Sequence, residues 1–129
     1  MSKVKSSYYY AELQSWLGSI NFYTEQKLII DARLDEVIKR NSLIDIAAKV
    51  EAHQILLNEI IEKFNKIKMD IDSQLKSIKV DDNFIEDVSL NKELEESQTD
   101  LRQKISSAEK EYIDIKAYCF DFLSETLNK

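Results

Sequence analysis

The sequence predicts an all-α protein, an antiparallel up-down-up bundle of three helices with coiled-coil packing. Apolar residues recur at alternating steps of three and four in three long segments, which places them on one side of an α-helix. The 129-residue chain also contains no proline and one glycine, so it lacks the residues that favour the tight turns of β-hairpins and sandwiches. At this length, one helical domain over residues 1–129 is expected.

The first helix is predicted over about residues 7–40. Ser6 or Ser7 is expected to cap its first turn by accepting hydrogen bonds from free backbone N–H groups. Lys39 and Arg40 fall in the last turn, where cations interact favourably with the helix dipole. Its core positions form the series Leu13, Trp16, Ile20, Tyr23, Lys27, Ile30, Leu34 and Val37.

The second helix is predicted over about residues 43–79. Asn41 and Ser42 interrupt the apolar rhythm, and Ser42 with Asp45 forms a variant of the capping box. A helix that continues through Asn41 and Ser42 is the alternative. The core series of this segment is Leu43, Ile46, Val50, His53, Leu57, Ile60, Phe64, Ile67 and Ile71.

The third helix is predicted over about residues 84–127, after a turn at residues 80–83. Phe84, Ile85 and Val88 are out of phase with the later series, so they are expected to form a lid or short turn before the regular part of the helix. The core series here is Leu94, Gln98, Leu101, Ile105, Ala108, Tyr112, Ile115, Cys119 and Phe122.

Folding the chain about Asn41 and Asp82 places core residues of the three helices at common levels. One predicted level contains Ile30, His53 and Tyr112, and another contains Trp16, Ile67 and Gln98. This register assumes short connections, because helices joined by short turns lie antiparallel.

Four residues form a predicted polar layer in the core: His53, Tyr112, Lys27 and Gln98. The Tyr112 hydroxyl is expected to satisfy His53, and such a layer fixes the register of the helices. The alternative for His53 is a metal ligand or a pH-responsive group. Lys27 is expected to extend its ammonium to water, and Gln98 to accept a hydrogen bond from the Trp16 indole.

Composition disfavours several classes of function. The net charge of −6 opposes binding to nucleic acid or to anionic membranes. No apolar segment approaches the ~20 residues of a membrane span, and residues 1–10 do not form a secretory signal. Cys119 is the single cysteine and cannot form an internal disulfide. A cytoplasmic protein with neither nucleic-acid nor membrane partners is expected.

Motifs for catalysis are missing from the sequence. It contains no phosphate-binding loop, no dinucleotide fingerprint and no zinc-ligand spacing. The predicted register separates Cys119 from His53, so a nucleophile–base pair is not expected. We predict that the protein is not an enzyme and binds no metal or cofactor.

Seven apolar residues fall outside the core series and predict an interface. Most map to the half of the bundle near the first turn, and apolar surface gathered in one region is typical of a contact with another protein. A second copy is the expected partner, because isologous dimers are the commonest oligomers. The alternative is that wider helical stripes cover these residues, which are Phe22, Leu28, Ile29, Ile44, Ile55, Ile113 and Phe120.

Part of the chain resembles a group of small bacterial helical proteins to which no activity is assigned. The matching residues, within residues 16–75, are Trp16, Ile20, Phe22, Tyr23, Glu25, Arg33, Leu34, Glu36, Val37, Glu51 and His53. In that group an aromatic residue, Gln and Asn follow the histidine, whereas Gln54, Ile55 and Leu56 follow here. The resemblance implies a bacterial cytoplasmic protein.

The function these features favour is a non-catalytic protein–protein interaction module. It would be an adaptor or a small acidic chaperone that holds a partner helix in a groove. One alternative is a structural bundle that assembles into a homo-oligomer. The other is a metal- or pH-responsive bundle centred on His53.

Overall fold

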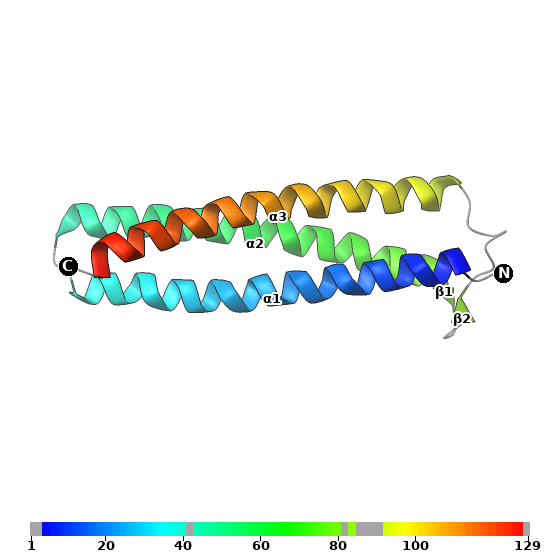
Figure 1. The fold of residues 1–129 in the computed structure, drawn as a ribbon, viewed down its shortest axis with the longest axis horizontal. Coiled ribbons are helices and arrows are strands. Elements are labelled where there is room, and N and C mark those ends of the chain that lie inside the picture. The colour runs from blue at the N-terminus through cyan, green and yellow to red at the C-terminus, as the bar shows by residue number, and fades with distance from the viewer. Residues whose placement is uncertain (1–3, 41–42, 81–82, 85–91, 128–129) are drawn as a thin grey trace. The chain divides into compact units, whose positions relative to one another are not determined.

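Three long helices make up nearly all of the described chain. A computed structural model of the protein describes residues 4–40, 43–80, 83–84 and 92–127. The helices are α1 (Val4–Arg40), α2 (Ile44–Ile78) and α3 (Lys92–Leu127). The two short strands are β1 (Lys79–Val80) and β2 (Asn83–Phe84), and Figure 1 shows all five elements in chain order. The helices pack against each other, which confirms the all-α three-helix bundle.

Residue contacts divide the chain into two compact units. Unit 1 comprises Met1–Asn21 and Phe64–Ser107, and unit 2 comprises Phe22–Lys63 and Ala108–Lys129. Each unit contains one segment of every helix. The prediction of a single domain stays a prediction.

The direction of α1 relative to α3 follows from side-chain pairs in unit 1. Lys5 pairs with Glu95 and Glu12 pairs with Arg102. Both members of these pairs advance by seven residues, so α1 and α3 run parallel.

The direction of α2 relative to α3 follows from contacts in unit 2. Lys63 pairs with Glu111, and His53 stacks on Tyr118. Because a later residue of α2 meets an earlier residue of α3, these two helices run antiparallel. The up-down-up order is therefore confirmed.

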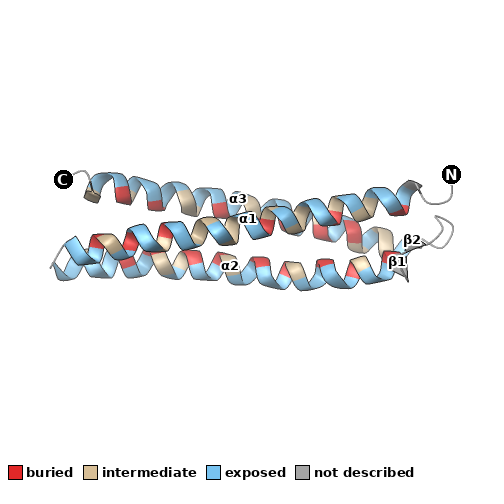
Figure 2. Cartoon of the chain, turned by 90° about the horizontal axis from the view of Figure 1, so that it is seen from below, coloured by how far each residue is buried: buried red, intermediate tan, exposed pale blue. Residues whose placement is uncertain are grey.

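The core follows the predicted series closely. Figure 2 shows buried residues recurring along each helix between exposed ones. In unit 2 the buried cluster contains Ile30, Leu34, Val37, Val50, Leu57, Cys119 and Leu123. In unit 1 the buried apolar residues include Leu13, Ile20, Phe64, Ile67, Ile71, Ile78, Leu101 and Ile105. Full burial of such a side chain contributes about 1.5–3 kcal/mol.

The predicted register between the helices is wrong by about one heptad. The Tyr112 hydroxyl reaches Gln26, whereas the prediction placed Tyr112 level with Ile30 and His53. The His53 ring instead meets Tyr118 and Phe122. The prediction folded the chain back at residue 82, but α3 begins only at Lys92. A slip of one heptad still brings core positions against core positions, so the apolar pattern alone does not reveal the shift.

The helix ends differ from the prediction at two places. Helix α1 already includes Ser6 and Ser7, so neither is the N-cap. The buried position of Ser6 shows that packing extends this end, as tertiary contacts do for most protein helices. Helix α2 agrees with the prediction to within one residue. Leu43 precedes α2 and is exposed, so it is not a core residue.

The α2–α3 connection begins with a small β-hairpin. Lys79 pairs with Phe84 and Val80 with Asn83, in antiparallel register. The third helix therefore does not start at residue 84. The hairpin was not predicted, because two residues per strand are too few to show the alternating pattern of a β-strand. Ile85 and Val88, predicted as a lid, and Ser42 of the capping box lie outside the described residues.

None of the described helices combines the length and the apolar character that crossing a membrane requires.

Candidate functional site

The predicted interface residues are all exposed and all lie in unit 2. Every one of the seven belongs to the exposed large hydrophobic residues of the described chain. Of that exposed set, only Tyr8 and Met69 lie in unit 1. Unit 2 therefore presents most of the exposed apolar surface that the structure describes. The prediction from sequence did not include three further exposed residues of this unit, Ile38, Leu43 and Tyr118.

Four of the seven lie together on α1 and α3. Phe22 and Ile29 are seven residues apart on α1, and Ile113 and Phe120 are seven apart on α3, a spacing that keeps each pair on one face of its helix. Their exposed fractions are 54%, 62%, 58% and 46%. We call these four residues the α1–α3 stripe.

Contacts between α1 and α3 place the two halves of the stripe side by side. The Tyr23 hydroxyl donates to Glu109 at 2.6 Å, and the Tyr112 hydroxyl donates to Gln26 at 2.7 Å. The Tyr23 and Tyr112 rings are 4.6 Å apart. Tyr23 is adjacent to Phe22 and Tyr112 is adjacent to Ile113, so these contacts anchor both helices next to the stripe.

The anchoring tyrosines stay protonated at neutral pH. Burial, followed by the hydrogen bond to the Glu109 carboxylate, raises the pKa of Tyr23 to about 12. Burial also raises the pKa of Tyr112 to about 12. Both hydroxyls therefore remain hydrogen-bond donors over the physiological pH range.

A lysine lies beside the stripe. Lys116 Nζ is 3.5 Å from Gln26 Oε1 and 5.8 Å from the centre of the Phe120 ring. A cation over an aromatic face is attracted by the ring quadrupole. The Phe120 ring itself is 46% exposed.

The other three predicted residues lie outside the stripe, and their part in an interface stays a prediction. Leu28 is next to Ile29, and successive residues point about 100° apart around a helix. Ile44 and Ile55 lie on α2, which contributes nothing to the stripe. These positions follow from the spacing along each helix and do not depend on the register between helices.

His53 is buried in unit 2 between two rings. It lies 4.3 Å from the ring of Tyr118 and 4.5 Å from that of Phe122, stacked on both. Its Nδ1 lies 2.6 Å from the Lys49 carbonyl, and since a carbonyl only accepts, Nδ1 carries the hydrogen. Nε2 is buried with no hydrogen-bond partner in the described chain. The predicted contact with the Tyr112 hydroxyl is therefore wrong.

Lys27 ends in an ion pair. Its Nζ lies 2.8 Å from Asp31 Oδ2, and the two side chains are 19% and 22% exposed. A carboxylate one turn along α1 therefore pairs with its ammonium, and the predicted extension of the ammonium to water stays a prediction.

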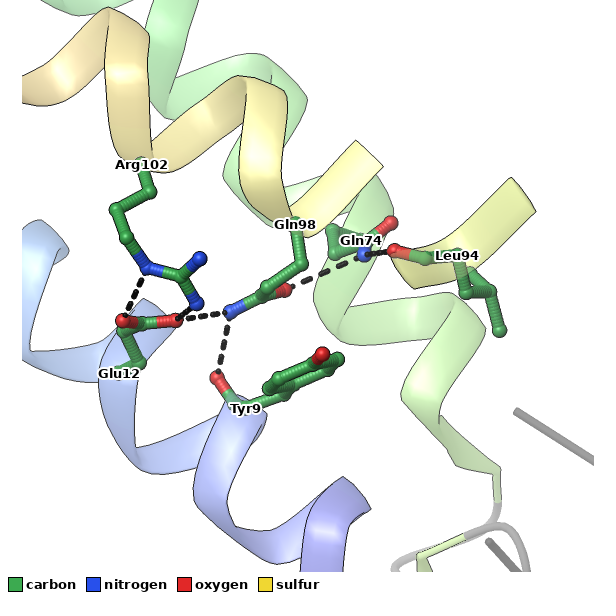
Figure 3. A network of polar contacts seen from close by, with 6 residues as sticks. All are labelled: Tyr9, Glu12, Gln74, Leu94, Gln98 and Arg102. Carbon is green, nitrogen blue, oxygen red and sulfur yellow. Dashed lines mark hydrogen bonds and ion pairs between the residues drawn. The ribbon is translucent and has the colours of Figure 1, made fainter. Parts of the chain in front are cut away.

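Gln98 lies at the centre of a polar network in unit 1, shown in Figure 3. Its Nε2 donates to Glu12 at 2.9 Å and to the Tyr9 carbonyl at 3.3 Å. Its Oε1 accepts from Gln74 at 3.3 Å. The predicted hydrogen bond with Trp16 is wrong, because the heptad shift places Gln98 beside residues nearer the start of α1.

An arginine completes this network. Arg102 donates from Nε and Nη2 to the two oxygens of Glu12, at 2.9 and 2.7 Å. Burial alone would raise the pKa of Glu12, but the hydrogen bonds from Arg102 and Gln98 outweigh burial and lower it. Gln74 also donates to the Leu94 carbonyl at 2.9 Å. The buried amide of Gln98 thus joins all three helices, which is the arrangement expected of a residue that sets their register.

The predicted separation of Cys119 from His53 along the bundle is wrong, because His53 stacks on Tyr118 and Phe122, which flank Cys119 in α3. Within residues 4–40, 43–80, 83–84 and 92–127, no cluster of three or more His, Cys, Asp or Glu could hold a metal ion. A polar groove of about 310 Å³ lies between α2 and α3 in unit 1. Lys104 there pairs with both Asp70 and Asp100.

Cys119 is expected to react slowly in the folded protein. Burial, and then the nearby Asp31 carboxylate, raise the pKa of its thiol to about 11. At about pH 8 this leaves roughly 100-fold less thiolate than in the unfolded chain, and thiolate is the reacting form. Alkylation by iodoacetamide, followed by mass spectrometry, should therefore be at least that much slower without denaturant than with it. Equal rates would contradict the burial of Cys119.

Comparison with known proteins finds no match for this chain among protein-family models, curated proteins or solved structures. The resemblance of residues 16–75 to small bacterial helical proteins stays a prediction.

Proposed function

We propose that this protein is a non-catalytic protein–protein interaction module, an adaptor or small acidic chaperone, that binds through unit 2. The observation that carries the proposal is the α1–α3 stripe, in which four large apolar side chains remain about half exposed. Contiguous apolar surface with polar surroundings is typical of a binding site. A cytoplasmic location is part of the proposal and is supported by the single, buried cysteine.

Two structural features support binding over catalysis. The hydroxyls of Tyr23 and Tyr112 beside the stripe are engaged in holding α1 to α3. His53, the single histidine, is 3% exposed and stacked between two rings, so it is poorly placed to meet a substrate. Its surroundings also do not support the metal-responsive alternative.

Site-specific photo-crosslinking tests this proposal. A photoreactive phenylalanine analogue replaces Phe22 or Phe120 in cells that naturally make the protein, and adducts are separated by mass. We expect covalent adducts with a protein from both positions. The matched control is Met69, which is more exposed, at 69%, but lies in unit 1. Equal yields at Met69 and the stripe, or no adduct from the stripe, would count against the proposal.

A further inference from the structure

We infer that the partner of the α1–α3 stripe is the same stripe on a second copy of this chain, related by a two-fold axis. This inference rests on the proposed function, because it names the occupant of the same surface.

The stripe residues form a crossed pattern. Along α1 the aromatic residue comes first, Phe22 before Ile29, whereas along α3 the aliphatic residue comes first, Ile113 before Phe120. Helices α1 and α3 run parallel, and Gln26 meets both Tyr112 and Lys116, so Phe22 lies within about one helical turn of the level of Ile113. By the same offset, Ile29 lies within about one turn of the level of Phe120. The two rings therefore occupy one diagonal and the two isoleucines the other.

A crossed pattern is complementary to itself. A two-fold axis along the helices places Phe22 opposite Ile113 of the partner subunit. A two-fold axis across the helices places Phe22 opposite Ile29 of the partner subunit. In both arrangements each ring meets a branched aliphatic side chain. No ring therefore lies opposite a ring, and no isoleucine lies opposite an isoleucine, which favours close packing across the interface.

The exposed area suits the centre of a dimer interface. Since a large apolar side chain presents about 150–250 Å², four that are about half exposed offer on the order of 400 Å². A stable interface buries roughly 800 Å² on each partner, with an apolar core and a polar rim. The stripe supplies the core, and the neighbouring polar residues supply the rim.

Charges of both signs border the stripe. Glu25 is exposed on the α1 side and forms no ion pair with the described residues, while Lys110 and Lys116 lie on the α3 side. A surface that recruits a charged partner presents a field of one sign. A rim with both signs fits a second copy, whose own rim carries the same mixture.

Sedimentation velocity over a range of concentrations tests the inference with the full chain. The wild-type protein is expected to form a dimer of twice its 15.1 kDa mass. Phe22→Asp and Phe120→Asp should each raise the dissociation constant about 30-fold or more, as loss of a central apolar contact does. The matched controls Leu28→Asp and Ile55→Asp change exposed apolar residues outside the stripe and should leave the dimer intact. Circular dichroism verifies that all four variants stay folded.

Mixing two variants that dimerise weakly distinguishes self-association through the stripe from binding of a different protein. Phe22→Asp is mixed with Ile113→Lys, and separately with Ile29→Lys. The heterodimer that matches the direction of the axis would contain one aspartate–lysine contact and three unchanged contacts, whereas each homodimer would contain two disrupted contacts. One of the two mixtures should restore a 1:1 dimer, and which one does so identifies the direction of the two-fold axis.

Three outcomes would overturn the inference: a wild-type monomer at every concentration, a dimer disrupted only by the Leu28 or Ile55 variants, or no recovery in either mixture. The proposed function is judged separately by the photo-crosslinks. If the purified chain is monomeric but the stripe forms adducts with another protein, the inference fails and the proposed function stands. If neither a dimer nor an adduct forms, both fail.

Discussion

Replacing Gln98 with Glu is expected to lower the free energy of unfolding by about 3–5 kcal/mol at neutral pH, the cost of leaving a buried charge uncompensated. In the native protein Gln98 is fully buried and its amide donates to Glu12 at 2.9 Å. A carboxylate at this position would face Glu12 without a hydrogen to donate. It would also remove the side-chain hydrogen bond to the Tyr9 carbonyl.

The pH dependence of this variant should have a distinctive sign. In the native protein the pKa of Glu12 is lowered from 4.5, so its contribution to stability is present above that value and is lost as the pH falls through its folded pKa. The new carboxyl would behave in the opposite way. Burial and the Glu12 charge raise its pKa, so acid protonates it and restores a donor to Glu12.

The matched control is Gln98→Leu, which removes the hydrogen bonds without adding a charge. It should cost about 1–3 kcal/mol, the penalty for buried groups left unsatisfied. Both variants are unfolded with denaturant at several values between about pH 7 and pH 4. As the pH falls, the free energy of unfolding of the Glu variant should rise relative to that of the Leu variant. A constant difference between the two would show that Gln98 does not lie against Glu12 in a buried site.

The helices and their buried faces could be predicted from the sequence because both depend on local spacing. Residues three and four apart share a helix face whatever lies opposite. Of the predicted core positions whose burial is described, Leu43 alone is exposed. The hairpin and the start of α3 depend instead on a connection that has no periodic signal.

Hydrogen-bond partners could not be predicted, because they depend on the register between helices. A heptad pattern specifies that core positions meet, but it leaves shifts of a whole heptad unresolved. Tyr112 and Gln98 were correctly placed in the core and given the wrong partners. In the structure they bind Gln26 and Glu12, each on α1. Polar residues such as these distinguish registers that apolar residues leave equivalent.

The residues of the candidate site could be predicted from the sequence, but their positions relative to one another on α1 and α3 could not. Phe22 and Ile113 were recognised as exposed from their place outside the core series. Contacts between α1 and α3, such as the Tyr23–Glu109 hydrogen bond, bring these positions into the same part of unit 2. The predicted offset between the two helices differs by about one heptad and pairs Phe22 with an earlier part of α3.

Truncating two leucines of unit 2 should give sharply different results. Leu57→Ala is expected to lower the free energy of unfolding by about 2–5 kcal/mol, because it deletes buried methyl groups and leaves a cavity. Leu57 is completely buried in the cluster with Leu34 and Val50. Leu28→Ala removes the same atoms from a side chain that is 64% exposed, and should change stability by no more than about 0.5 kcal/mol.

The comparison is informative because the two substitutions have the same chemistry and the same effect on helix propensity. Any difference between them therefore measures burial, not the loss of a leucine. Chemical denaturation should be performed at protein concentrations low enough to leave the chain monomeric, because association adds to apparent stability. A Leu28→Ala loss as large as that of Leu57→Ala would mean that the outer face of α1 is covered in the monomer. The bundle would then bury a surface that the helical spacing assigns to solvent.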